Sequence, residues 1–196
     1  MSLFSDATFP EDISWSSLIK EIEALNQDQS VHGILVQLPL PPSLVEEEII
    51  NAIDPSKDVD GLHPLNLTRL FLNSKEPYIT PCTPLGCFHL ISQTGLSISG
   101  KRAVVIGRSR LVGKPMGALL TNLNATVTVC HSYTANLEEL VREADILVVA
   151  VGKKEVVKGE WIKEGSCVID VGINQLGEEE SKRKITGDVG DFETAV

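Results

Sequence analysis

Apolar residues in the first third of the chain form one helical pattern and one continuous run. Across residues 16–26 they recur at helical spacing with charged residues between them, which predicts an amphipathic helix. The largely apolar stretch 33–38 ends at a group of prolines and predicts a strand buried on both faces, as in a parallel sheet. A second helix is predicted over 43–53, capped by Ser43, and a loop over 57–66.

Helical and strand patterns alternate regularly in the rest of the chain. Thr83 and Pro84 are predicted to open a helix that Gly95 closes. Strands are then expected at 102–106, 126–130, 146–151 and 167–171, helices at 113–122 and 137–143, and a helical turn near Trp161. This alternation predicts an α/β fold with a Rossmann-like, doubly wound parallel sheet. A domain boundary is expected near Thr80, and the polar segment 177–184 is expected to be a hairpin or loop.

Composition and charge narrow the class of protein. With 196 residues, 42% of them hydrophobic and 22% charged, the chain has the make-up of an ordinary soluble globular protein. A net charge of −10 argues against a nucleic-acid partner. No stretch approaches the roughly 18 apolar residues of a membrane span, and no signal-peptide pattern opens the chain. The four cysteines form no CxxC pair, so we expect no metal site or disulfide and a reducing, cytoplasmic environment.

The segment 107–115 carries the clearest chemical signal. It joins a predicted strand to a predicted helix through Gly107 and Gly113, an arrangement that aims backbone N–H groups and the helix dipole at a phosphate. Five residues separate the two glycines, and Pro115 stands where a P-loop has the Ser or Thr that holds magnesium. A P-loop ATP site is therefore excluded, and the strict G-x-G-x-x-G fingerprint is also absent.

The end of the next predicted strand favours NADP over NAD. Dinucleotide-binding units usually place an acidic residue about 20 positions beyond the glycine turn, where it holds the ribose 2′-hydroxyl. Here Ser132 stands in that region without a carboxylate, and its hydroxyl could donate to a 2′-phosphate while Arg108 pairs with it. The alternative is that Arg108 is a surface charge and Ser132 a loop hydroxyl. Gly172, after the last predicted strand, is either a turn residue or a nucleotide contact.

Two polar residues of the first part could meet a ligand. Gln37 is an amide at the end of an apolar run, and a buried amide needs a partner, either a neighbouring backbone group or a ligand heterocycle. Asp60 could accept paired hydrogen bonds from an amino-substituted heterocycle, although a turn-forming Asp-Gly is the alternative. The segment 58–61 lacks the remaining acidic positions of a calcium loop, and the scattered histidines are given no catalytic role.

Five motifs occur in an order that resembles the methylenetetrahydrofolate dehydrogenase/cyclohydrolase family. They are residues 31–41, 57–61, 81–84, 107–115 and 187–189. The resemblance covers essentially the whole chain and implies an enzyme that is usually a homodimer. It implies a partial folate-binding, catalytic α/β domain over 1–80 and an NADP-binding Rossmann-like domain over 81–196. The implied reactions are NADP-dependent oxidation of 5,10-methylenetetrahydrofolate to 5,10-methenyltetrahydrofolate and hydrolysis of that product to 10-formyltetrahydrofolate.

The resemblance also implies roles for particular residues. It places Gln37 in the catalytic site and Asp60 at the pterin of the tetrahydrofolate substrate. The implied cofactor contacts are Gly107, Arg108, Ser109, Ser132 and Ile173, with Arg108 and Ser132 at the 2′-phosphate.

The chain departs from the family pattern in its proton-transfer pair. The family has a Tyr-x-x-x-Lys pair on a helix upstream, whereas Tyr78 and Tyr133 are followed four places on by Cys82 and Leu137. The family's glycine- and proline-rich folate loop, downstream of the Gly-Asp-Val motif, is also missing, so we expect a member that lacks both ends. One alternative is a non-catalytic NADP- and folate-binding module. Another is a related NADP-dependent dehydrogenase of the shikimate type, against which the Gln37 and Asp60 motifs argue.

Overall fold

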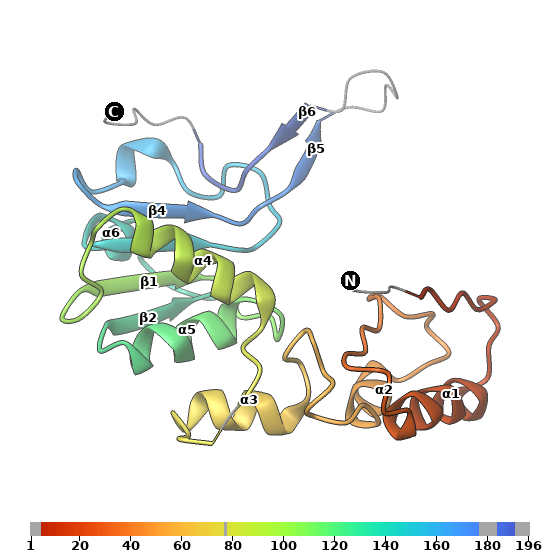
Figure 1. Ribbon diagram of the computed structural model, residues 1–196. Coiled ribbons are helices and arrows are strands. Elements are labelled where there is room, and N and C mark those ends of the chain that lie inside the picture. Colours follow the sequence, from red (N-terminus) through yellow and green to blue (C-terminus); the bar gives the residue numbers. More distant parts are fainter. Residues whose placement is uncertain (1–4, 77, 177–183, 191–196) are drawn as a thin grey trace.

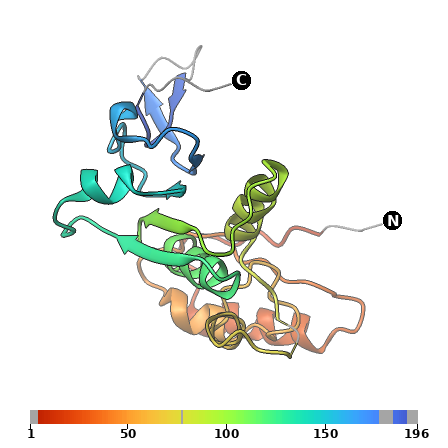
Figure 2. The ribbon, with the colours of Figure 1, turned by 90° about the vertical axis from the view of Figure 1, so that its left-hand side faces the viewer.

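The computed structural model describes residues 5–76, 78–176 and 184–190 of the chain. They form a mostly helical N-terminal unit and a C-terminal unit built on a parallel sheet (Figure 1). In Figure 2 the N-terminal unit, in red and orange, lies behind the sheet. No helix among the described residues is long and apolar enough to cross a membrane.

The N-terminal unit has its own apolar core. Helix α1 (Trp15–Gln27) confirms the amphipathic pattern, and it begins where the Ser14 hydroxyl accepts a hydrogen bond of 3.2 Å from the Ser17 N–H. Its buried face joins residues of the loops and of helix α2 (Glu46–Asn51) in one cluster. The buried members of this cluster are Leu18, Ile22, Ile34, Leu44, Ile49, Ile50, Ile53 and Leu62.

The prediction of a strand over residues 33–38 is wrong. Ile34 forms only an isolated parallel bridge with Asp58, and Leu35 is 57% exposed. A strand buried on both faces needs pairing partners and a covering layer on each face, and among the described residues a single bridge pairs with this run. The prolines that follow, Pro39 and Pro41, lack the N–H groups that would extend a ladder.

Two helix starts also differ from the sequence predictions. Helix α2 begins at Glu46, because the Leu44 N–H bonds to the Pro41 carbonyl in a preceding turn, and the Ser43 side chain does not cap it. Helix α4 (Cys82–Gln93) begins one residue before Thr83, again without a side-chain cap. Gly95, with φ 76°, follows its end as predicted.

A helix occupies part of the segment that was predicted to be a loop. Helix α3 (Pro64–Phe71) begins with its proline in the first turn, and His63 Nδ1 accepts a hydrogen bond of 3.0 Å from the Leu65 N–H. A proline suits this position because the first helical N–H has no partner within the helix.

The C-terminal unit contains the predicted parallel sheet. The strands are β1 (Arg102–Ile106), β2 (Thr126–Cys130), β3 (Ile146–Val149) and β4 (Cys167–Asp170), the helices α5 (Gly113–Asn122), α6 (Leu137–Arg142) and the 3₁₀ helix η1 (Gly159–Trp161). The spatial order is β2-β1-β3-β4, and every pair is parallel. The α/β fold is therefore confirmed. A short antiparallel pair follows, β5 (Asn174–Leu176) with β6 (Lys184–Thr186), and residues 177–183 of the predicted hairpin lie outside the described residues.

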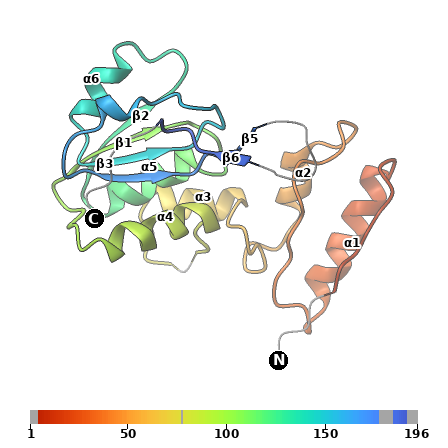
Figure 3. The same ribbon diagram turned by 90° about the horizontal axis from the view of Figure 1, so that it is seen from above.

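Helices cover both faces of the sheet. Alternate residues of β1 and β3 point to opposite sides, so that Val105 and Val148 pack with α4 and α5 while Val104 and Leu147 pack with α6. Figure 3 shows α6 on one side of the sheet and α4 and α5 on the other. Burial on both faces explains why these strands read as continuous apolar runs.

The two units meet where α3 packs against α5. Asn122 of α5 donates a hydrogen bond of 2.7 Å from Nδ2 to the Leu70 carbonyl of α3. Arg110 and Glu47 form a second link, with 3.6 Å between their charged atoms. The apolar clusters do not mix across this junction, since one lies within residues 13–62 and two lie within 87–189.

Candidate functional site

The turn from β1 to α5 is built on two glycines that no other residue can replace without displacing main chain. Gly107 has φ 123°, and a Cβ there would overlap the Ala150 carbonyl oxygen at the end of β3. A Cβ on Gly113 would overlap the Gly107 carbonyl itself. The end of β1, the start of α5 and the end of β3 are therefore in close main-chain contact.

This contact lies where the direction of the sheet order changes. From β1 the chain goes to β2 on one side and afterwards to β3 on the other. The Gly107 N–H bonds to the Cys130 carbonyl at 2.9 Å, and the Ala150 N–H bonds to the Ile106 carbonyl at 2.8 Å. Open parallel sheets bind ligands outside the carboxyl ends of the strands at such a switch point.

The turn offers unpaired backbone donors at its exposed tip. Ser109 Oγ accepts hydrogen bonds from the N–H groups of Val112 and Gly113, at 3.1 and 3.4 Å, and so shapes the helix start. Within the described part of the chain, no hydrogen bond uses the N–H groups of residues 108–111, and these residues are exposed. Successive free N–H groups before a helix N-terminus form a cradle for an anion.

Arg108 and Ser132 lie on neighbouring strand ends. Each stands two residues beyond the paired positions Ile106 and Cys130, and both are exposed. Among the residues that the structure describes, Arg108 has no carboxylate partner, whereas the other arginines do. The paired arginines are Arg69 with Glu76, Arg102 with Glu143, Arg110 with Glu47 and Arg142 with Glu138.

Ile173 stands at the same edge of the sheet, beyond β4. Ile173 is 73% exposed, which is unusual for isoleucine. The preceding Gly172 has a packing role, because a Cβ there would overlap the Asp188 carboxylate. The structure thus brings the five predicted cofactor contacts to one edge, after β1, β2 and β4.

Gln37 does not have the environment that the sequence predicts. Its side chain is exposed, and Nε2 donates a hydrogen bond of 2.9 Å to the carbonyl of the adjacent Leu38. The expectation of a buried amide failed together with the strand, since Ile34, Val36 and Leu38 pack against the core of the N-terminal unit whereas Gln37 is exposed. Of the two partners considered for this amide, a neighbouring backbone group and a ligand heterocycle, the structure shows the backbone group.

Asp60 keeps an unpaired carboxylate in a half-buried position. Burial and the neighbouring Asp58 carboxylate raise its pKa, and none of the hydrogen bonds within the described residues reaches it. Asp58 is buried and accepts bonds from the His63 N–H at 2.8 Å and Asn66 Nδ2 at 2.9 Å. Asp58 thus holds the start of α3, and Asp60 is the group available to a ligand.

Lys57 fixes the same segment to α1. Its Nζ donates to the carbonyls of Leu25, Asn26 and Asp28, at 2.7–2.9 Å, where α1 ends. A cation at this helix end is favoured by the helix dipole.

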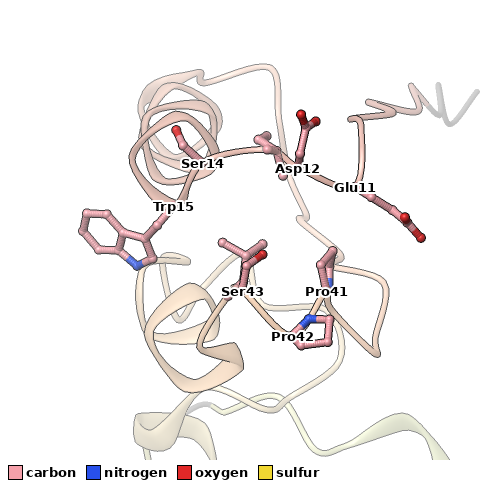
Figure 4. Close-up of a pocket in the computed structure, with 9 residues that line it drawn as sticks. Glu11, Asp12, Ser14, Trp15, Pro41, Pro42 and Ser43 are labelled. Atoms are coloured by element: carbon pink, nitrogen blue, oxygen red, sulfur yellow. The ribbon is translucent and has the colours of Figure 1, made fainter.

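Two surface grooves of the described chain lie apart from these residues. One, of about 610 Å³, runs between the start of α1 and the proline turn before α2, with Trp15, Pro41 and Pro42 on its walls (Figure 4). The other, of about 360 Å³, lies between α2 and α3 and reaches Arg110. Neither is lined by a predicted site residue, so the structure does not join Gln37 and Asp60 to the sheet edge in one of these cavities.

Family models match both parts of the chain. The model described as tetrahydrofolate dehydrogenase/cyclohydrolase, NAD(P)-binding domain, matches residues 81–196. The chain belongs to this family. The model of the tetrahydrofolate dehydrogenase/cyclohydrolase catalytic domain matches residues 3–60.

Individual members of the family agree in sequence and in fold. The "Bifunctional protein FolD" of Bradyrhizobium sp. (strain ORS 278) is 53% identical over 95% of the chain and 63% of its own length. The crystal structure of the FolD methylenetetrahydrofolate dehydrogenase/cyclohydrolase of Campylobacter jejuni has a TM-score of 0.86 at 46% identity, over 91% of this chain and 62% of that one. The Trypanosoma brucei enzyme, complexed with NADP cofactor and inhibitor, has a TM-score of 0.86 at 40% identity, over 92% and 62%. The chain thus spans less than two thirds of these relatives.

The NAD(P)-binding part of this family member contains two structural carboxylates that the sequence reasoning missed. Asp188 is fully buried and accepts four hydrogen bonds. The donors are the N–H groups of Val151 (2.8 Å), Gly152 (2.9 Å) and Lys153 (2.8 Å) and Asn174 Nδ2 (2.9 Å). Asp170 in turn accepts from the N–H groups of Gly172, Asp188 and Val189, at 2.8–3.0 Å. The sequence showed Asp188 only as part of a motif, without a partner.

Proposed function

We propose that the chain carries the coenzyme site and part of the folate site of an enzyme of one-carbon metabolism. That enzyme oxidises 5,10-methylenetetrahydrofolate to 5,10-methenyltetrahydrofolate with NADP⁺ and hydrolyses the product to 10-formyltetrahydrofolate. The observation that carries the proposal is the glycine turn at the switch point, with its free N–H groups, in a member of this family.

The residues present fit a dinucleotide. The N–H groups of residues 108–111 and the start of α5 would hold the pyrophosphate. Arg108, which pairs with no carboxylate of the described residues, and the Ser132 hydroxyl would hold the 2′-phosphate, since the residues that follow β1 and β2 directly carry no carboxylate to repel it. NADP⁺, when bound, supplies the hydride acceptor, and the protein's part in that step is to fix the distance and angle between the two rings.

The folate part rests on Asp60. Its raised pKa and missing hydrogen-bond partner show a carboxylate that the described residues do not satisfy. Paired hydrogen bonds from the amino-substituted pterin would satisfy it, because an ionised carboxylate accepts at both oxygens. Gln37, exposed on the same unit, would stand beside the reacting carbon, as the family resemblance implies.

The second candidate function is binding without catalysis. It is favoured by one observation, namely that Gln37 is exposed and donates its hydrogen bond to the carbonyl of the adjacent Leu38. Under this alternative the chain binds coenzyme and folate but transfers no proton.

Calorimetric titration and a turnover assay test both candidates. We expect the chain to bind NADP more tightly than NAD, and NADPH absorbance to rise when 5,10-methylenetetrahydrofolate is added. Binding of NADP without turnover favours the binding module. If neither coenzyme binds, the proposed function is wrong.

The assembly and compartment are also proposals. The family resemblance supports a homodimer, which sedimentation velocity would detect as twice the mass of the chain. The four cysteines are free thiols, which supports a reducing, cytoplasmic environment.

A further inference from the structure

The turn after β3 is held by a single buried carboxylate. Three successive N–H groups, those of residues 151–153, point at Asp188, which lies 35 to 37 positions away in the sequence. Asp188 has no exposed surface, and among the described residues no cation pairs with it, so the dipoles of backbone N–H groups and one side-chain amide face its charge there. A carboxylate that accepts several N–H bonds in this way fixes the conformation of the donors.

The same carboxylate ties this turn to the one after β4. Asn174 donates a hydrogen bond to Asp188 Oδ1. Asp170, the last residue of β4, accepts a hydrogen bond from the Asp188 N–H. Gly172 and Gly187 leave no space between the two carboxylates, because a Cβ on either would overlap one of them. The turns after β3 and β4 therefore cannot shift independently.

These two turns lie across the switch point from the candidate 2′-phosphate site. That site is at the ends of β1 and β2, whereas Asp188 acts at the ends of β3 and β4. A dinucleotide bound across a switch point reaches both sides. The half that is remote from the 2′-phosphate, the nicotinamide, would therefore lie against the turn of residues 151–153 and the exposed Ile173.

We propose that Asp188 is a positioning residue for the nicotinamide half of the coenzyme. The inference rests on the proposed function. In it, one buried side chain fixes the turns after β3 and β4 that would face the nicotinamide, without itself touching the ligand. The predicted consequence is that loss of the Asp188 charge weakens binding of the nicotinamide half of the coenzyme and not binding of the half that carries the 2′-phosphate.

Asp188→Asn tests this with the smallest change of shape. The amide replaces one acceptor oxygen by a donor, so at least one N–H of the turn faces another N–H and loses its partner. The matched control is Asp145→Asn. Asp145 likewise accepts a backbone N–H, from Arg102 at 3.0 Å, and pairs with Lys163 at 2.6 Å, but it lies at the opposite, amino-terminal edge of the sheet.

The two probes are NADP and adenosine 2′,5′-bisphosphate, which is the half of NADP that carries the 2′-phosphate. In Asp188→Asn we expect NADP affinity to fall about tenfold or more, equivalent to about 1.4 kcal/mol, while the affinity for the bisphosphate changes less than about twofold. Asp145→Asn should leave both affinities unchanged. Hydrogen exchange of residues 151–153 should speed up in Asp188→Asn even without nucleotide.

A milder variant guards against misfolding. Asn174→Ala removes one donor to Asp188 and should weaken NADP binding in the same direction by a smaller factor. Equal loss of both probes, or loss of neither, overturns the inference. If the wild-type chain binds neither probe, the proposed function fails, and the positioning role fails with it.

Discussion

Arg108 is the residue on which coenzyme preference is expected to depend. It has no ion-pair partner within the described chain and lies beside the end of β2. Arg108→Ala should weaken NADP binding about 10- to 100-fold, because a hydrogen-bonded charge pair with the 2′-phosphate is lost. NAD binding should change little. Calorimetric titration of both coenzymes measures the difference.

Arg110→Ala is the matched control for that change. Arg110 is a near neighbour that already pairs with Glu47, so its removal should affect both coenzymes alike and weakly. Equal losses of NADP and NAD affinity in Arg108→Ala would contradict a 2′-phosphate role.

The raised pKa of Asp60 has a consequence for stability. Between the ordinary aspartate pKa of 3.8 and the raised pKa, the folded state binds more protons than the unfolded state, so stability falls as pH rises through this window. Asp60→Asn should therefore stabilise the chain at neutral pH, by less than about 1 kcal/mol because the side chain is half exposed. The gain should vanish toward the lowest pH at which the protein is folded. Urea unfolding across this pH range measures it.

Asp54→Asn provides the opposite sign. Hydrogen bonds from Ser56 lower the pKa of Asp54, so this variant should lose rather than gain stability at neutral pH.

Asp60→Asn should also weaken tetrahydrofolate binding while NADP affinity remains. A folate affinity equal to that of the wild type would leave Asp60 as a mere turn residue.

At the scale of elements, the turn between β1 and α5 depends on main-chain packing. Gly113→Ala should cost about 1–3 kcal/mol and impair nucleotide binding, because its Cβ overlaps carbonyl atoms that cannot rotate away. Gly86→Ala is the control. Gly86 lies in α4 with nothing within 4 Å of an added Cβ, and alanine there should stabilise by about 0.5–1 kcal/mol. Urea denaturation compares the two, and a neutral Gly113→Ala would contradict the close contact.

The sequence predicted elements well where local pattern and tertiary environment agree. The bounds of β1, α5 and β2 are those expected, because the apolar run of the buried β1, the alternating threonine and valine of the largely exposed β2 and the helical pattern between them are distinct. The apolar run 33–38 misled because such a run does not say whether partner strands are present. Helix α3 could have been found from Pro64, a favoured first-turn residue.

The candidate site was only partly predictable, for a related reason. The glycine turn around Gly107 can be recognised in the sequence because its residues fall within nine consecutive positions. Asp188 does not, because three of its donors lie 35 to 37 positions away and come together only in the folded chain. The predicted burial of Gln37 is wrong because it was inferred from a strand that does not form.

At the scale of the whole molecule, the separation of the apolar clusters supports the proposed division into residues 1–80 and 81–196. Both clusters of the C-terminal unit lie entirely within 87–189. A fragment of residues 81–196 should therefore fold alone and bind NADP within a few-fold of the whole chain. Circular dichroism and calorimetric titration check this.

Asn122→Ala in the full chain is the companion variant. It removes the hydrogen bond to the Leu70 carbonyl and should loosen the junction of α3 with α5 without loss of nucleotide affinity. An unfolded fragment, or one that no longer binds NADP, would mean that the two units form a single folding unit.

The main-chain contacts of Gly107 and Gly113 also bear on how such a protein can diversify. The atoms that define the turn belong to the backbone, whereas the candidate discriminating groups of Arg108 and Ser132 extend from it into solvent. Exchange of one coenzyme for the other can then proceed by substitution at two codons, with little penalty to folding. Selection for coenzyme preference and selection for folding would therefore act on separate positions of the gene.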